Sequence, residues 1–449
     1  MSYPSYPEYK KSGLDWFGDV PSHWESKKIA WDLPYQVGWT PPSGNDKYYD
    51  GDLPWVTIAD MTADRIQDTQ TKITQQAVLD RGAEKAPAGS MLFSFKLSVG
   101  SVAFLEKAAY TNEAIAAFLP NSSVDLKFWQ YAAPIFISQY GRENIYGALL
   151  LNQELIGSVR FFAPPYPEQT QIARFLDHQT ARIDALIAEQ QRLIELLKEK
   201  RQAVISHAVT KGLDPDVAMK DSGVEWLGEV PEHWNVPAIK RLSVVQRGAS
   251  PRPIDDPIYF DEEGEYGWVR IADVSASSGY LESTTQTLSA FGSSLSVKLE
   301  PGALFVSIAG TVGKPCITNI KSCIHDGFVY FPELSINPKF LYYIFESELC
   351  YKGLGKLGTQ LNLNTETIGG IKVGLPPESE IEDIVGYLEK RLSQIDEMSD
   401  QAGATVELME ERRSALISAA VTGKIDVRNW EPPVSETFPQ STTSEEAPA

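Results

Sequence analysis

The chain carries SGLDWFGDVPSHW at residues 12–24 and SGVEWLGEVPEHW at residues 222–234. All differences between the two copies are conservative except Ser22 against Glu232. Further matches follow in the same order: WVTIAD at residues 55–60 returns as WVRIAD at 268–273, and Pro164-Pro165 returns as Pro376-Pro377. Chance similarity would not keep the separation of the copies constant to within three residues. We therefore predict a duplicated module and a pseudo-two-fold internal repeat.

The segments between the matches differ freely. Residues 38–53 have little in common with 248–266, and residues 101–112 have little in common with 314–325. A shared scaffold with divergent loops is typical of two related tasks carried out on two different targets.

The globular parts are expected to be α+β. Short strand-like runs at 55–58, 91–95, 269–271 and 304–308 are separated by Gly, Pro, Ser and Asn. Helical patterns lie near 125–140 and 338–350. We place the two globular domains at residues 1–166 and 214–377.

A long helix is predicted after each globular domain, at residues 167–213 and 378–424. Apolar residues recur there with the 3.5-residue period of a coiled coil, Pro precedes each segment, and Gly212 and Gly423 follow. Gly386 and Gly403 weaken the second helix. We expect an antiparallel coiled coil about 60 Å long at 1.5 Å per residue. Its expected packing residues are Ile172, Leu176, Ile183, Leu186, Leu193, Leu197, Ile384, Leu388, Ile395, Met398 and Met409.

Composition narrows the class of protein. No apolar run is long enough to span a membrane, and the N-terminal residues contain no apolar stretch typical of a secretory signal. Three cysteines without CxxC spacing favour a reducing cytoplasm and neither disulfides nor a zinc site. The net charge of −20 argues against nucleic acid binding. A DNA-binding role then requires basic groups gathered locally, or partners that contact the phosphates.

The order of these words resembles the specificity subunits of Type I restriction-modification systems. The resemblance rests on the doubled SGx(D/E)WxG(D/E)VPxHW word, on LPWVTIAD at 53–60, on PPYPEQ at 164–169, and on the helix ends at 200–205 and 412–417. It covers nearly the whole chain up to about residue 424. The second module departs from the pattern, because Pro376-Pro377 is followed by Glu-Ser-Glu and lacks the Gln of the first.

The resemblance implies that each globular domain is a target-recognition domain that reads half of a split site in double-stranded DNA. The helices would set the spacer between the halves. Two modification subunits would methylate adenine with S-adenosylmethionine. Two restriction subunits would use ATP and Mg to translocate and cleave foreign DNA. The chain itself would be non-catalytic and carry no cofactor.

Two catalytic motifs are approached in the sequence, but each lacks residues that its chemistry requires. Ala163 and Leu375 stand where the (Asn/Asp)-Pro-Pro-(Tyr/Phe) motif of amino-methyltransferases needs an amide or carboxylate. Ile308 and Pro315 break the phosphate-loop pattern around Gly313-Lys314. The repeated His23 and His233 are expected to be packing residues, and Trp16, Trp24, Trp226 and Trp234 to be core or partner-docking residues. The residues from 425 onward are expected to form a disordered tail.

DNA contacts are expected in the loops that differ between the modules, because Arg and Lys read guanine, Asn and Gln read adenine, and hydroxyls hold phosphates. The candidates in the first module are Thr40, Ser43, Asn45, Lys47, Tyr48, Tyr49, Lys96, Ser98, Lys107 and Arg142. The candidates in the second module are Arg247, Ser250, Arg252, Thr311, Lys314, Lys321, Lys356, Gln360 and Asn362. The segment from Arg247 to Arg252 and the Gly313-Lys314 turn are the better ones.

Two other classes of protein remain open at this point. A coiled-coil scaffold that binds only protein would account for the helices equally well. A self-sufficient methyltransferase is disfavoured because its cofactor motifs are missing.

Overall fold

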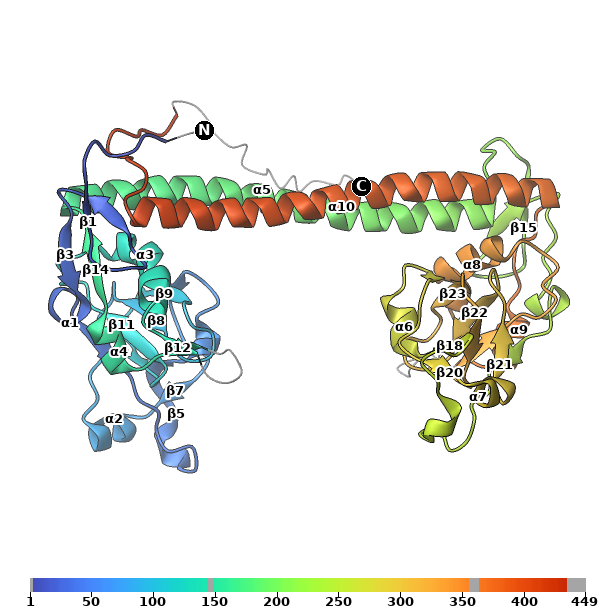
Figure 1. Cartoon of the computed structure of the whole chain (residues 1–449), viewed down its shortest axis with the longest axis horizontal. Helices are drawn as coiled ribbons and strands as arrows, with labels where there is room; N and C mark the ends of the chain where they lie inside the picture. Colours follow the sequence, from blue (N-terminus) through green and yellow to red (C-terminus); the bar gives the residue numbers. More distant parts are fainter. Residues whose placement is uncertain (1–2, 144–148, 355–362, 434–449) are drawn as a thin grey trace, which may run out of the picture. The chain divides into compact units, whose positions relative to one another are not determined.

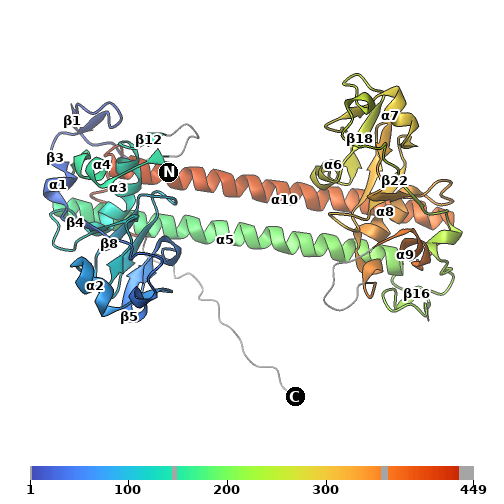
Figure 2. The ribbon, with the colours of Figure 1, turned by 90° about the horizontal axis from the view of Figure 1, so that it is seen from below.

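A computed structural model describes residues 3–143, 149–354 and 363–433 (Figures 1 and 2). The chain forms two compact units. Unit 1 comprises Met1–Glu189 and Thr405–Ala449, and unit 2 comprises Gln190–Ala404. Each unit contains one globular module, called module 1 and module 2 below, and a part of each long helix.

Module 1 is built around two sheets. The larger sheet has the order β4 (Tyr35–Val37), β11 (Ile115–Phe118), β8 (Met91–Ser94), β9 (Val102–Leu105) and β6 (Arg65–Ile66). The smaller sheet has the order β10 (Tyr110–Thr111), β5 (Tyr49–Val56) and β7 (Lys72–Ile73). The smaller sheet and α2 lie on the side of the module away from α5 (Figure 1).

Short elements complete module 1. The strand pairs are β1 (Tyr9–Lys11) with β2 (Asp19–Pro21), β3 (Glu25–Lys28) with β14 (Arg160–Ala163), and β12 (Arg142–Glu143) with β13 (Leu149–Leu150). The helices are α1 (Ile29–Asp32), η1 (Asp46–Tyr48), η2 (Ile58–Asp60), α2 (Gln75–Arg81), α3 (Leu126–Ser138) and α4 (Gln153–Ser158).

Module 2 repeats this plan. Its larger sheet has the order β17 (Gln246–Arg247), β25 (Phe328–Tyr330), β22 (Leu304–Ser307), β23 (Pro315–Thr318) and β19 (Tyr280–Leu281). Its smaller sheet has the order β20 (Thr287–Leu288), β18 (Tyr266–Val269), β24 (Ser322–Ile324) and β21 (Val297–Leu299). β18 pairs parallel with β24 just as β5 pairs parallel with β10. The duplication expected from the sequence is confirmed at the level of sheet order.

The remaining elements of module 2 are short strands and helices. They are β15 (Met219–Asp221) paired with β16 (Glu229–Pro231), η3 (Ile239–Arg241), η4 (Pro257–Tyr259), α6 (Ile271–Ala276), α7 (Ala290–Ser294), α8 (Pro338–Glu346), η5 (Leu349–Tyr351) and α9 (Thr365–Gly370). Asn337 caps α8 as Asp125 caps α3, since each side chain accepts a hydrogen bond from the backbone two residues on.

The long helices are α5 (Tyr166–Lys211) and α10 (Glu378–Val421). Each is followed by a glycine with a left-handed backbone, Gly212 at φ +74 and Gly423 at φ +73, which ends the helix. The ion pair Asp184–Arg413 joins the helices within unit 1, and Arg201–Asp396 joins them within unit 2. Residue numbers rise along α5 as they fall along α10, so the helices run antiparallel, as the sequence predicts.

The expected packing residues divide by their exposure. Ile172, Leu176, Ile183, Leu197, Ile384, Leu388 and Ile395 are buried, and Met409 is half-buried. Leu186, Leu193 and Met398 are 44%, 36% and 51% exposed, and Met398 lines a groove with Leu197 of the other helix. The buried members mostly belong to cores shared with a module. The exposed ones lie toward the helix middles.

The C-terminal segment differs from the expectation drawn from the sequence. Residues 425–430 were expected to be disordered, yet Val427 is buried, and Trp430 packs edge-on against Phe175 with ring centroids 5.2 Å apart. Gln171 donates a hydrogen bond to the carbonyl of Val427 at 3.1 Å. An aromatic residue with an apolar surface to cover accounts for the difference. Residues 434–449 lie outside the described residues.

Among the described residues, no helix combines the length and the apolar character needed to cross a membrane.

Candidate nucleic-acid interface

The repeated His-Trp word holds each module on the first turn of its own long helix. In unit 1, Glu168 accepts hydrogen bonds from the Trp24 indole at 3.1 Å and from the Tyr6 hydroxyl at 2.8 Å, and it contacts His23 at 2.8 Å. Burial raises the pKa of Tyr6, and the Glu168 charge adds to the effect. A carboxylate at a helix N-terminus is favoured by the helix dipole.

Unit 2 repeats the arrangement. Glu380 accepts from the Trp234 indole at 3.0 Å and contacts His233 at 2.7 Å. Trp24 and Trp234 are fully buried. The most strongly repeated word is therefore a structural joint that is the same in both modules, so it cannot tell one target from another.

Each module also has an equivalent segment that passes from the larger sheet to the smaller one, at Gly38 and at Gly248. The side chains on this crossing differ between the modules. The backbone N–H of Trp39 donates to Thr111 at 2.9 Å, and that of Ala249 donates to Ile324 at 3.1 Å. A Cβ at Gly38 would lie 1.9 Å from the backbone oxygen of Thr111, and a Cβ at Gly248 would lie 2.2 Å from that of His325. Only glycine permits this approach.

A hydroxyl and a carboxylate meet just beyond each crossing. Thr40 donates a hydrogen bond to Glu113 in module 1. Ser250 donates to Asp326 in module 2, at 3.0 Å. Glu113 follows β10 and Asp326 follows β24, the strands that pair parallel with β5 and β18 respectively, and each residue precedes the next strand of the larger sheet. The two pairs thus occupy equivalent places in the duplicated fold.

Two guanidinium groups join the pair in module 2. Arg252 Nη2 lies 3.1 Å from Asp326 Oδ2, and Arg247 Nε donates to the backbone carbonyl of the same residue. Partial burial acts to raise the pKa of Asp326, but the Ser250 hydroxyl and the charges of Arg252 and Arg247 outweigh it and hold the pKa below its ordinary value. Arg247 and Arg252, at opposite ends of the candidate segment, thus converge on one residue, Asp326.

Module 1 lacks that guanidinium pair. The hydrogen bond from Thr40 chiefly lowers the pKa of Glu113, and Lys96 contributes a smaller electrostatic effect. Glu113, Thr40 and Lys96 are exposed. This group is a carboxylate with free acceptor capacity, whereas the group in module 2 is a cluster of donors.

A hollow lies beside the group in module 1, whereas the lining of the hollow in module 2 includes none of Ser250, Arg252 and Asp326. In module 1 it has a volume of about 600 Å³, and Trp39, Thr40, Tyr48 and Glu113 contribute to its lining. In module 2 a hollow of about 1060 Å³ is lined in part by Trp268, Arg270 and Thr285. Arg270 donates to Thr285 and stands where the matching word of module 1 has Thr57.

The other candidates of module 1 are less clearly gathered. Tyr48 donates to Asp80 at 2.9 Å and Tyr49 to the carbonyl of Pro41 at 2.7 Å. The Asn45 side chain accepts from the Lys47 backbone at 3.3 Å. The structure leaves Ser43, Lys47, Ser98, Lys107 and Arg142 exposed.

Three candidates of module 2 are bound to neighbouring parts of the fold. Lys314 Nζ donates to the carbonyls of Ser275 and Ser277, both at 3.1 Å, so its ammonium fixes the Gly313-Lys314 turn onto α6. Thr311 is hydrogen-bonded to Ser275 at 2.9 Å. Lys321 forms an exposed ion pair with Glu265. The candidates Lys356, Gln360 and Asn362 lie outside the described residues.

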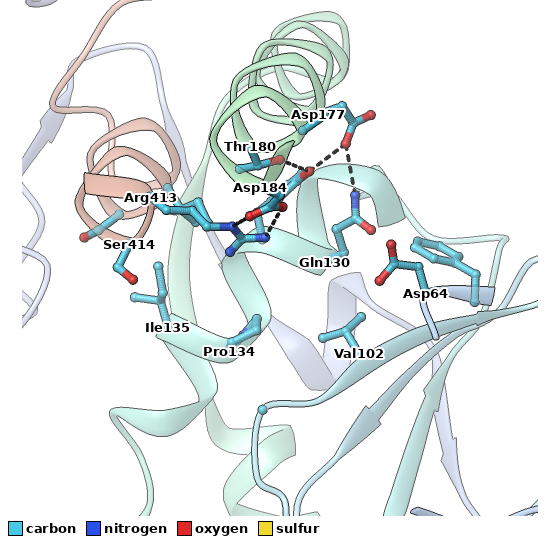
Figure 3. Close-up of a pocket in the computed structure, with 16 residues that line it drawn as sticks. Asp64, Val102, Gln130, Pro134, Ile135, Asp177, Thr180, Asp184, Arg413 and Ser414 are labelled. Carbon is cyan, nitrogen blue, oxygen red and sulfur yellow. Dashed lines mark hydrogen bonds and ion pairs between the residues drawn. The ribbon is translucent and has the colours of Figure 1, made fainter. Parts of the chain in front are cut away.

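A further cavity, in unit 1, does not suit DNA. It has a volume of about 650 Å³ and lies between α3, β9, α5 and α10 (Figure 3). Tyr131 donates to Asp177 at 2.7 Å, and Arg413 donates to Asp184 at 2.8 Å and 3.2 Å. With Asp64 also in the lining, carboxylates outnumber cations, so the cavity repels phosphate. Among the described residues, no group of three or more His, Cys, Asp and Glu side chains could hold a metal ion.

Sequence reasoning missed Glu113, Asp326 and Arg270. The candidates were basic, amide and hydroxyl side chains in the loops that differ between the modules. Glu113 and Asp326 are acidic, and Arg270 lies inside a word that the two modules share. The one available signal was the glycine shared by Val37-Gly38 and Arg247-Gly248, which marks the equivalent crossing.

Known proteins match the chain over most of its length. The family model of the Type I restriction modification DNA specificity domain matches twice, at residues 21–196 and 231–407. The Type I restriction enzyme MjaVIII specificity subunit of Methanocaldococcus jannaschii is 23% identical over 430 residues, which cover 91% of this chain and 95% of the relative. The putative MjaX specificity subunit of the same organism is 24% identical over 452 residues, covering 94% and 97%.

Solved structures share the fold. A chain from a study of complex assembly and conformational transition of the type I R-M system has a TM-score of 0.71 at 15% identity, covering 90% of this chain and 98% of that one. The HsdS subunit from Thermoanaerobacter tengcongensis has a TM-score of 0.54 at 14% identity, covering 92% and 100%.

Proposed function

This chain belongs to the family of Type I restriction-modification DNA specificity subunits, and from that premise we propose that it reads a bipartite, asymmetric DNA site, one half with each module. Members of this family recognise DNA sequence and are not themselves catalytic. The observation that carries the proposal is the equivalent crossing at Gly38 and Gly248, which presents a carboxylate in one module and a guanidinium pair in the other. Two similar scaffolds with unlike reading groups suit two unlike half-sites.

The chemistry would come from partner subunits. We propose that two modification subunits methylate adenine with S-adenosylmethionine, and that two restriction subunits use ATP and Mg to act on foreign DNA. Because this chain has a net charge of −20, those partners would supply much of the phosphate contact. The antiparallel helices α5 and α10 would set the spacer between the half-sites.

DNA contacts in this proposal centre on the two crossings. Arg247, Ser250 and Arg252 would face the half-site of module 2, and Thr40, Tyr48 and Lys96 that of module 1. Arg252→Ala should weaken binding of the assembled methyltransferase by about 1–3 kcal/mol if its guanidinium reads a base. An unchanged dissociation constant in a DNA titration would remove Arg252 from the interface.

A protein-only coiled-coil scaffold is the alternative. Mobility shifts of labelled DNA separate the two functions, because a scaffold leaves the specificity of the modification subunit unchanged. The chain with its modification subunit should shift DNA that contains the site and release it to specific competitor.

The decisive experiment maps N6-methyladenine across the genome of a host that expresses this chain with its modification subunit. We expect one split motif with two unlike halves and a constant spacer. The host without this chain is the control. Methylation without a motif, or with a continuous symmetric one, would contradict the proposal.

A further inference from the structure

We propose that Glu113 and Asp326 occupy the same reading position in the two modules and give it opposite preferences. Asp326 orients Arg247 and Arg252 to donate hydrogen bonds to guanine. Glu113 itself accepts a hydrogen bond from the exocyclic amino group of cytosine or adenine. This inference rests on the proposed function, since it presumes that each module faces one half-site.

The equivalence of the two positions comes from backbone geometry. Gly38 N–H donates to Ile115 at 3.3 Å, and Gly248 N–H donates to Phe328 at 3.0 Å. β11 and β25, which these bonds reach, hold the same place in the two larger sheets. The hydroxyl of Thr40 and that of Ser250 then meet the carboxylate on the same connection between sheets. A difference at this position is therefore a difference in side chains on a common frame.

In module 2 the carboxylate is occupied. Ser250 donates to Oδ1, and Arg252 donates to Oδ2 from one of its five N–H groups. The Arg252 side chain is 73% exposed, so its remaining donors are open to a ligand. Arg247 is also exposed and is tied to the backbone oxygen of Asp326. Guanine offers the paired acceptors, O6 and N7, that a guanidinium held in this way recognises.

In module 1 the carboxylate keeps acceptor capacity. Thr40 is its one side-chain donor among the described residues, and a carboxylate has about four lone-pair sites. Val37 and Pro42 stand where module 2 has Arg247 and Arg252. A carboxylate without a guanidinium accepts hydrogen bonds, and in the major groove the donors available to it are the amino groups of cytosine and adenine.

Stability gives a poor account of these groups. An exposed ion pair contributes roughly 0–1 kcal/mol, and Arg252 and Asp326 are both well exposed. An arrangement of two arginines and a hydroxyl around Asp326 is better explained by the orientation of the guanidinium groups than by the energy of folding.

The test compares motifs methylated by the assembled methyltransferase carrying Arg252→Ala, Asp326→Asn or Glu113→Gln. The first two should relax the requirement for one guanine in a single half-site, with a loss of about 10- to 100-fold in discrimination against the other bases there. Glu113→Gln should relax a cytosine or adenine in the other half only. Asp326→Glu should retain the parent motif. Lys198→Ala, which removes an exposed charge on α5, is the matched control and should change neither half.

A second measurement covers variants that fail to fold. The parent complex is titrated with duplexes in which 7-deazaguanine, which lacks the N7 acceptor, replaces each guanine in turn. Affinity should fall about 10-fold or more at one guanine of one half-site. If no guanine shows such a loss, or if the variants alter both halves or neither, the reading position is wrong. In each of those cases a split parent motif still supports the proposed function, and only its absence would overturn that function itself.

Discussion

At the scale of single residues, the joint between each module and its helix depends on one carboxylate. Glu168 is hydrogen-bonded to three side chains in unit 1, including the buried Tyr6 and Trp24. Glu380 is hydrogen-bonded to two in unit 2, His233 and Trp234. Removing an acceptor from buried donors costs the desolvation of each one.

The first prediction follows from this difference. Glu168→Ala should lower the free energy of unfolding by about 2–4 kcal/mol, because two buried donors lose their acceptor. Glu380→Ala should cost less, because that carboxylate serves fewer donors and is more exposed. Urea denaturation monitored by tryptophan fluorescence measures both, with the exposed Glu189→Ala as control. Equal losses would show that the Tyr6 hydrogen bond contributes nothing.

Sequence patterns predicted these residues unevenly. The repeat identified His23, Trp24 and their copies because it preserved them. It gave no role to Glu113 or Asp326, because what they do depends on side chains that arrive from another loop of the fold. Local patterns carry no information on such contacts.

At the scale of elements, α10 contains two glycines that no packing demands. A Cβ added at Gly386 or Gly403 would meet no atom within 4 Å. The sequence predicted that they weaken the helix, and helix propensity gives the size of the effect.

The second prediction is therefore a gain of stability. Gly386→Ala and Gly403→Ala should each raise the free energy of unfolding by about 0.5–1 kcal/mol. Gly423→Ala is the opposite control, because its φ is +73 and its Cβ would lie 2.5 Å from Pro21 Cδ. Thermal unfolding of the three variants should show two increases and one decrease in Tm. A loss at Gly386 would mean that the helix needs its flexibility there.

The third prediction tests the register of the helices. Arg413→Asp places two carboxylates together at Asp184 and should cost about 0.5–1 kcal/mol, the size typical of exposed pairs. The double variant Asp184→Arg with Arg413→Asp should recover most of that loss. The same cycle at Arg201 and Asp396 is its repeat in unit 2. Additive effects in both double-mutant cycles would contradict antiparallel pairing.

Helices were easier to predict than sheets. Pro165 and Gly212 bracket α5 in the sequence itself, so its ends were visible. The order β4-β11-β8-β9-β6 joins strands that lie far apart in the chain, and no local period encodes which strands pair. The two-sheet plan of each module therefore became known only from the structure.

At the scale of the whole molecule, the chain enters unit 2 through α5 and returns to unit 1 through α10. The return completes unit 1, since Val427 is buried there and Asp426 N–H donates to the carbonyl of Pro4 at 2.7 Å. Sequence composition had assigned this segment to a tail without structure.

The fourth prediction concerns that return. Ending the chain after Gly423 should destabilise unit 1 by about 2–4 kcal/mol, because Trp430 no longer covers Phe175. Hydrogen exchange followed by mass spectrometry should show faster exchange in β8 and unchanged exchange in β22. A chain ending after Pro433 is the control. Unaltered protection of β8 would show that the returning segment adds no stability.

The fifth prediction is an order of folding. Unit 2 is one continuous stretch, whereas unit 1 must join Glu189 and the chain before it to Thr405 and the chain after it. Closing so long a loop costs conformational entropy before its contacts form. Folding of unit 2 reduces that entropy cost. Its parts of α5 and α10 pair antiparallel, so the two ends of unit 2 are already close together when unit 1 forms.

Pulse-labelled hydrogen exchange during refolding measures this order on the full chain. The reporters are β8 and β22, which are fully buried and hold the same place in the two larger sheets. The duplication thus supplies its own control, because the strands differ mainly in the connectivity of their units. β22 should be protected first. Protection of β8 at the same time or earlier would show that module 1 gains its stability from residues 1–189 alone, without waiting for α10 to return.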